Sequence, residues 1–245
     1  MRTLPLLCLL SVAACGTRRA VEVVQPLTAG LDPEVVVAVE SARGAVLSAL
    51  EDLPARIEYA AVLDANELDE AAEEAWREVT ERAPDEAKPW YHLARVRERR
   101  GETEAALEAL ARVHELAPDY APAHLRAGRL QLETGALDEA QPALERALAL
   151  EPGSLQASMA SARLLLLRAR AAEAIALLEP LVQRHPRETY LNGLLARAWA
   201  MQGDEERARR FLEAEEHAGQ FTARDPWQAE VARHECGLRV RLERA

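Results

Sequence analysis

Small and large apolar residues recur along this chain once every 34 residues. When residues 53–222 are written as five rows of that length, position 8 of each row is alanine or glycine. Position 20 is alanine throughout, at Ala72, Ala106, Ala140, Ala174 and Ala208. Leucines around these positions follow the 3.6-residue period of an amphipathic helix. The pattern predicts two helices per row that approach closely at the small residues, and a stack of such pairs.

Glycine and proline indicate where these helices end. Four rows have a proline two residues before their end, at Pro84, Pro118, Pro152 and Pro186. Proline lacks a backbone donor and restricts its predecessor, so the second helix should stop there. Between the two helices stand Gly101, Gly135 and Gly203, which suit a left-handed turn residue. Rows 53–86 and 155–188 have Glu67 and Ala169 at this position, and we expect less ideal turns there.

Two flanking segments carry helix-start signals. Asp32, Pro33 and Glu34 supply an N-cap, a proline at the first helical position and an acidic first turn. Residues 32–52 are therefore predicted to form a helix that packs against the first row. Asp225-Pro226 repeats the signal, and residues 223–245 are predicted to be either a helix that caps the far end of the stack or a loosely ordered tail.

The rows resemble the tetratricopeptide repeat family over about 170 of the 245 residues. Row 87–120 carries the pattern almost intact, with Trp90, Leu93, Ala94, Gly101, Ala106, Leu110, Leu116 and Pro118. Row 189–222 lacks the proline, and row 53–86 lacks the early Trp and Leu. The resemblance implies an all-α, right-handed superhelical solenoid of about five helix-turn-helix repeats (53–86, 87–120, 121–154, 155–188 and 189–222). It also implies that the first helix of each repeat lines a concave groove that binds a protein or peptide.

The start of the chain indicates export. The first three residues carry one positive charge, and the apolar run 4–14 is too short to span a bilayer. Residues 12–15, Val-Ala-Ala-Cys, resemble a bacterial lipobox, which implies a signal peptide over 1–14, lipidation of Cys15 and a tether over 15–31. In many Gram-negative bacteria, an aspartate directly after the lipidated cysteine resembles an inner-membrane retention signal. This chain has Gly16 at that position, so we expect the protein to lie on the outer membrane, facing the periplasm. An ordinary secretory signal cut near Ala14, or a buried apolar helix, is the alternative.

Charge restricts the partners. The formal net charge of −11 argues against nucleic acid. Against this background, position 9 of four rows is arginine, at Arg95, Arg129, Arg163 and Arg197. The resemblance places this position in the groove, and the other predicted groove residues are Lys88, Tyr91, His92, Arg99, Leu125, Arg126, Met159 and Tyr190.

Guanidinium groups bind both oxygens of a carboxylate, so an acidic peptide or the free C-terminus of a protein is one predicted ligand. An amphipathic peptide with apolar anchors is the other. Two alternatives need no ligand. Lys88 is the only lysine, which indicates a compositional bias toward arginine, and groove carboxylates such as Glu98 or Glu133 could neutralise the arginines.

The sequence offers no catalytic or metal-binding pattern, and we expect no cofactor. The six histidines are scattered, without a second ligand type at metal-binding spacing, and no glycine-rich phosphate loop is present. The predicted function is a non-catalytic scaffold or adaptor on the bacterial envelope, bound to the membrane through its lipid only, that assists assembly or localisation of an envelope complex. A pilotin-like role is one version of it. The alternative is an accessory regulatory subunit of an envelope enzyme or polysaccharide export system.

Overall fold

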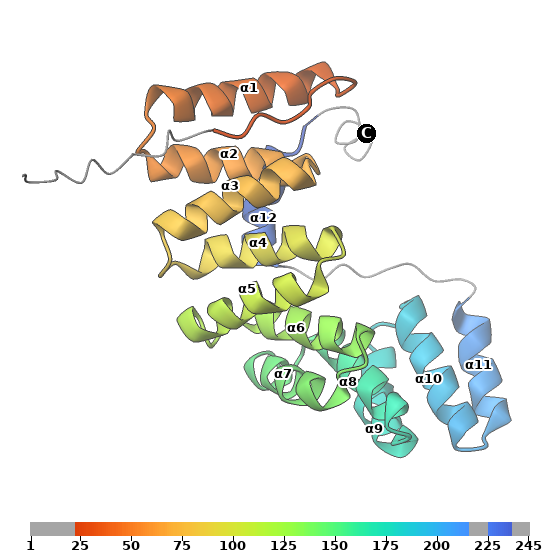
Figure 1. Ribbon diagram of the computed structural model, residues 1–245. Coiled ribbons are helices and arrows are strands. Elements are labelled where there is room, and N and C mark those ends of the chain that lie inside the picture. The colour runs from red at the N-terminus through yellow and green to blue at the C-terminus, as the bar shows by residue number, and fades with distance from the viewer. Residues whose placement is uncertain (1–22, 216–224, 237–245) are drawn as a thin grey trace, which may run out of the picture.

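The computed structural model describes residues 23–215 and 225–236. The predicted signal peptide, Cys15 and residues 16–22 of the predicted tether lie outside these residues. Within the described ranges the chain forms twelve α-helices and one short 3-10 helix and contains no strand (Figure 1). None of these helices is both long enough and apolar enough to cross a membrane.

Ten helices form five consecutive pairs, and the predicted all-α solenoid is confirmed (Figure 1). The first helix of each pair begins at the first residue of a 34-residue row. The pairs are α2 (Leu53–Ala65) with α3 (Asp69–Arg82), α4 (Ala87–Arg99) with α5 (Thr103–Leu116), α6 (Ala121–Glu133) with α7 (Leu137–Leu150), α8 (Leu155–Leu167) with α9 (Ala171–Val182), and α10 (Thr189–Met201) with α11 (Glu205–Glu215).

Small residues allow the two helices of a pair to approach closely. The alanines at position 20 are all buried, and Ala60, Ala94 and Ala162 at position 8 are fully buried. Gly128 occupies position 8 of the third pair. A Cβ at Gly128 would lie 2.6 Å from the side chain of Leu144, which is closer than such atoms approach in proteins. A side chain there would push α6 and α7 apart.

The turns inside the pairs use a left-handed residue in every case. Gly101, Gly135 and Gly203 have φ angles of 77°, 77° and 82°. Glu67 and Ala169 adopt a φ of 57° at the equivalent positions, although a Cβ is strained there. The left-handed conformation allows the same hydrogen bond to close the turn. Leu68 N donates to Leu63 O, just as Glu102 N donates to Arg97 O in the second pair.

The repeated prolines also anchor the next pair. In three rows the side chain at position 4 donates a hydrogen bond to the carbonyl of the preceding proline, six residues earlier. These bonds are Trp90 Nε1 to Pro84 O at 3.0 Å, His124 Nε2 to Pro118 O at 2.8 Å, and Asn192 Nδ2 to Pro186 O at 3.2 Å. Each bond holds the end of one pair against the start of the next.

The helix predicted at the N-terminal flank is α1 (Pro33–Ser48), and Val39 and Val46 bury its apolar face in the core shared with α2 and α3. At the other flank, α12 (Pro226–Val231) begins after Asp225 as expected, followed by the 3-10 helix η1 (Ala232–His234). A cap at the far end of the stack was the wrong expectation for this helix. Helix α12 and η1 lie against α2 instead, and Figure 1 shows α12 behind α2, α3 and α4.

Candidate functional site

The predicted groove residues fall into two groups along the solenoid. We call the surface of α2, α4 and the start of α6 the N-terminal groove. It is covered by residues 225–236, which we call the C-terminal segment. We call the surface of α6, α8 and the start of α10 the C-terminal groove. First helices of neighbouring pairs adjoin there, with α8 in contact with both α6 and α10.

A buried carboxylate organises the floor of the N-terminal groove. The side chain of Asp64 on α2 is fully buried and accepts hydrogen bonds from Trp76 Nε1 at 3.2 Å and Arg99 Nη2 at 2.7 Å. Arg95 Nη1 lies 3.4 Å from the same carboxylate. The first arginine of the predicted series is therefore neutralised inside the protein, because a buried cation requires a partner.

His92 belongs to this floor. Its ring stacks on Trp76 with 4.7 Å between the ring centroids. Burial, together with the nearby Arg95 cation, lowers the pKa of His92 to about 3. The imidazole is therefore neutral at physiological pH, and His92 acts as a packing residue in this fold.

Asp225 is the main anchor of the C-terminal segment. Tyr120 OH donates to Asp225 Oδ1 at 2.7 Å, and Tyr91 OH donates to the other carboxylate oxygen. Burial raises the pKa of Asp225, but the hydrogen bonds from both tyrosines and from Gln228 N outweigh it, and the pKa lies below its ordinary value of 3.8. Asp225 is thus a charged anchor whose hydrogen bonds come from two successive helix pairs.

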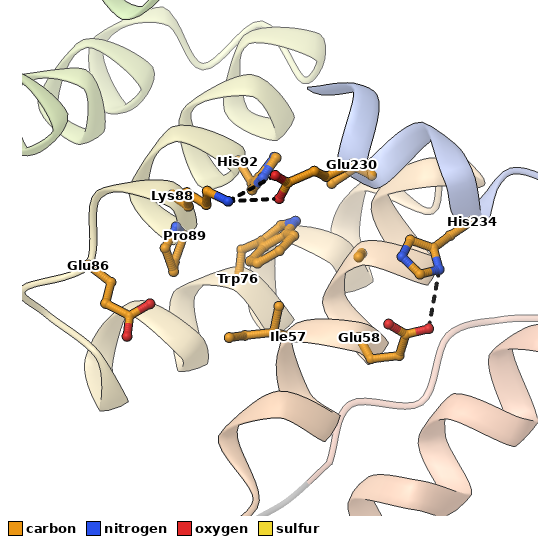
Figure 2. A pocket seen from close by; sticks show the side chains of 11 residues that line it. Ile57, Glu58, Trp76, Glu86, Lys88, Pro89, His92, Glu230 and His234 are labelled. Atoms are coloured by element: carbon orange, nitrogen blue, oxygen red, sulfur yellow. Dashed lines mark hydrogen bonds and ion pairs between the residues drawn. The ribbon is translucent and has the colours of Figure 1, made fainter. Parts of the chain in front are cut away.

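Aromatic and ionic contacts fix the rest of α12. The Trp227 ring stacks on Tyr120 at 3.6 Å between centroids. Lys88 Nζ donates to both carboxylate oxygens of Glu230, each at 2.9 Å, and Figure 2 draws this pair as dashed lines. Val231 is buried in the core formed with α1, α2 and α3. The contacts of α12 therefore combine charge, ring stacking and apolar burial.

The end of the C-terminal segment is bound by α2 and by its C-cap residue, Asn66. Asn66 Nδ2 donates to His234 O at 3.1 Å, and Cys236 N donates to Asn66 Oδ1 at 3.2 Å. His234 Nδ1 lies 3.2 Å from Glu58 Oε1 (Figure 2). Burial raises the pKa of the Cys236 thiol, so the thiol is protonated at physiological pH. Between the segment and the groove floor remains a cavity of only about 150 Å³.

The C-terminal groove is open. It contains a cavity of about 470 Å³, lined by Arg129, Leu132, Glu133, Gln156, Met159, Ala160, Arg163, Glu188 and Tyr190. Arg129 is exposed and Arg163 is half-buried. Within residues 23–215 and 225–236, neither arginine has a carboxylate within ion-pair distance. Arg197 is exposed and likewise unpaired there, but it does not line this cavity.

The residue at position 12 of each first helix accounts for part of this difference. It is acidic in the first two pairs, where Asp64 pairs with Arg95 and Arg99 and Glu98 pairs with Arg126. It is apolar in the later pairs, at Leu132, Leu166 and Ala200. Arg163 and Arg197 therefore follow a pair without an acid at this position, whereas Arg129 follows Glu98, which pairs with Arg126 instead.

The structure brings most of the predicted groove residues into one of the two halves. Lys88, Tyr91 and Arg126 contact the C-terminal segment, whereas Arg129, Arg163 and Tyr190 line the open cavity. Two further predicted groove residues are partly or wholly taken up by the core. Met159 lines the open cavity as predicted, but its side chain is almost fully buried in the core of the last pairs. Leu125 packs on the core formed by α6, α7 and α8.

The sequence reasoning missed Asp64, Tyr120, Asp225 and Trp227. The signal for Asp64 was an acid on the groove-facing helix, three residues after the arginine position. Asp225 and Trp227 were visible as a helix start, but no periodicity indicates where that helix packs. In the described part of the chain, no cluster of three or more His, Cys, Asp or Glu side chains could hold a metal ion.

An α-solenoid of five helical hairpins whose first helices line grooves is typical of repeat proteins that bind other proteins. Models of the tetratricopeptide repeat match residues 61–121, 97–164 and 132–197, which together span more than half of the chain. The chain therefore belongs to the tetratricopeptide repeat family. Comparison with curated proteins gives no significant match.

Solved structures share the fold at low sequence identity. A tetratricopeptide repeat protein from Parabacteroides merdae is 18% identical, with a TM-score of 0.67 and coverage of 76% of this chain and 74% of that chain. YrrB, described as a TPR protein with an unusual peptide-binding site, is 17% identical, with a TM-score of 0.63 and coverage of 73% and 92%. Pseudomonas aeruginosa pilF is 17% identical, with a TM-score of 0.62 and coverage of 73% and 81%. At these identities the likeness concerns the fold.

Proposed function

We propose that this chain is a non-catalytic protein-interaction scaffold that binds a segment or domain of a partner protein in its C-terminal groove. Family membership supports the class of function, since stacked helical hairpins present extended concave binding surfaces. One observation carries the choice of site. The cavity of about 470 Å³ there contains two arginines without a carboxylate partner in the described residues.

The lining indicates the chemistry of the partner. Arg129 and Arg163 suit carboxylates, from acidic side chains or from the free C-terminus of a protein. Tyr190 is 47% exposed at the cavity and offers a ring for an apolar side chain. Glu133 also lines the cavity and can accept hydrogen bonds from backbone N–H groups of the partner. An acidic peptide with one apolar anchor fits this combination.

A charge-neutralising double variant tests the proposed site. Arg129→Gln with Arg163→Gln should remove most partners that the wild-type protein retains from bacterial envelope extracts, measured by quantitative mass spectrometry. The matched control is Arg146→Gln with Arg170→Gln, which removes two exposed arginines from surface pairs with Asp119 and Glu173. Control and wild type should retain the same partners. Identical partners for the site variant and the control would contradict the proposal.

We further propose attachment to the bacterial envelope through a lipid on Cys15, in the outer membrane facing the periplasm. The lipobox-like residues 12–15 support it. Incorporation of an alkyne-labelled fatty acid into the wild type, and its loss in Cys15→Ser, is the expected result. Labelling that persists in Cys15→Ser would contradict it.

On the envelope, the scaffold would assist assembly or localisation of a complex. A pilotin-like role is one form of this proposal, supported by the layout of five repeats with flanking helices. The retained partners would separate the two versions. Secretin or pilus proteins fit the pilotin-like form, whereas a glycosyltransferase or protease fits an accessory subunit of an envelope enzyme.

A further inference from the structure

We propose that the N-terminal groove is a second peptide-binding site, and that the C-terminal segment is its built-in ligand. The partner that this groove fits is a peptide from another protein with the same anchors. They are an acidic helix N-cap, a tryptophan two residues later, an acid three residues after the tryptophan, and a β-branched residue that follows it. This site is separate from the C-terminal groove and does not depend on the function proposed there.

The first argument is that several hydrogen bonds fix the orientation of the Asp225 carboxylate in the groove. The Asp225 carboxylate accepts from two tyrosine hydroxyls of the groove and also from Trp227 N and Gln228 N of its own helix, each at 3.1 Å. Burial raises the pKa of Tyr91 and of Tyr120, so both phenols keep the protons that they donate. The groove therefore binds the same carboxylate that caps the N-terminus of α12.

The second argument is that two tyrosine rings of the groove contact the ring of Trp227. Trp227 stacks on Tyr120 and meets the edge of Tyr91 at 5.5 Å between centroids. Lys88 binds Glu230 and lies 6.0 Å from the Trp227 ring centroid. Trp227 is half-buried in this position, and tryptophan is among the residues that most often dominate binding between proteins.

The third argument is the way in which the C-terminal segment is held. A helix of six residues is too short to be stable alone, so α12 depends on contacts with other helices. Those contacts come from the first helices of the first two pairs and from the start of the third, through Asn66, Lys88 and Tyr120. A peptide that runs along successive first helices occupies the groove as a separate ligand would.

Covalent connection gives the C-terminal segment a high effective concentration at the groove. A free peptide with the same anchors must compete with it. The wild-type protein should therefore bind such a peptide weakly, and a protein whose own segment is weakened should bind it well. This contrast separates an exchangeable ligand from a permanent part of the fold.

The test uses the full-length protein with Asp225→Asn and Trp227→Ala, which weakens the segment and leaves every groove residue in place. The probe is a fluorescein-labelled peptide of residues 224–236 with serine in place of Cys236, measured by fluorescence polarisation. We expect the double variant to bind the probe at least ten-fold more tightly than the wild type. A second peptide, with the four anchors retained and alanine elsewhere, should bind within about three-fold of the first.

Three controls keep the test decisive. Circular dichroism should show that the double variant keeps its helical content, because the substitutions lie outside the five pairs. A probe with alanine in place of Trp227 should not bind. Adding Arg129→Gln and Arg163→Gln should leave probe binding unchanged, so failure of the C-terminal groove function would not affect this result.

Two outcomes would overturn the proposal. The first is a folded double variant that binds the probe no better than the wild type, since the C-terminal segment would then be a fixed part of the solenoid. The second is a dimer of the wild-type protein, detected by sedimentation, that Asp225→Asn converts to a monomer. In that case the occupant of the groove would be a second copy of this protein.

Discussion

The two halves of the groove are built from the same repeat, but their basic side chains differ in whether they have carboxylate partners. In the N-terminal groove, Lys88, Arg95, Arg99 and Arg126 all have carboxylate partners, supplied by α2, α4 or the C-terminal segment. In the C-terminal groove, Arg129 and Arg163 have none among the described residues. A residue that recurs at one position of a repeat therefore has no fixed role, because its role depends on whether the neighbouring pair supplies an acid and on which arginine that acid binds.

The largest expected difference between the halves concerns their carboxylates. Asp64→Ala should lower the free energy of unfolding by about 3–5 kcal/mol, because it leaves Arg95 buried without its partner and removes the acceptor of Trp76 Nε1. Urea unfolding followed by circular dichroism measures the change. The matched control is Glu133→Ala in the C-terminal groove, which is exposed and should change stability by no more than about 0.5 kcal/mol. Equal losses of stability in Asp64→Ala and Glu133→Ala would show that the two grooves do not differ in how much their carboxylates stabilise the fold.

A smaller effect should depend on pH through His92. Its pKa falls from 6.5 in the unfolded protein to about 3 in the folded protein, because burial disfavours the charged form. Between these values the unfolded state binds a proton that the folded state does not, so stability is complete above pH 6.5 and falls as the pH is lowered. We expect a loss of about 2 kcal/mol between pH 6.5 and pH 5.

His92→Phe keeps a ring over Trp76 but cannot titrate. Urea titrations of both proteins at a series of pH values should show the loss in the wild type and a flatter profile in the variant. If both profiles fall equally, His92 is not the group responsible. Burial of an ionisable group at His92 would then not be a difference between the N-terminal groove and the C-terminal groove.

The smallest expected effect tests whether backbone strain differs between the halves. Glu67 lies in the first pair and Ala169 in the fourth, and both have a φ of 57°. Glu67→Gly and Ala169→Gly should each raise the free energy of unfolding by about 1 kcal/mol, since glycine adopts this conformation without strain. Thermal or urea unfolding measures the gain, and Gly101→Ala should cause a comparable loss. If only one of the two glycine variants gains stability, backbone strain contributes to the difference between the two halves.

The helix pairs could be predicted from the sequence because their causes are local. Small residues at positions 8 and 20, glycines at the turns and prolines at the row ends act within about 34 residues, and they recur in register. The less ideal turns at Glu67 and Ala169 could be predicted for the same reason. Position within the repeat also indicated which side chains face the groove, although burial at Met159 required the neighbouring helices.

By itself, then, the sequence determined the repeated hairpin, its period and the presence of a helix after Asp225. Only the tertiary structure decided that this helix returns to the start of the solenoid, where Asp225 meets Tyr91 and Tyr120 across more than 100 residues of sequence. It also decided which arginines are neutralised. The physical reason is that pairing of charges and rings depends on distances in space between segments far apart in the sequence, and no period along the sequence encodes those distances.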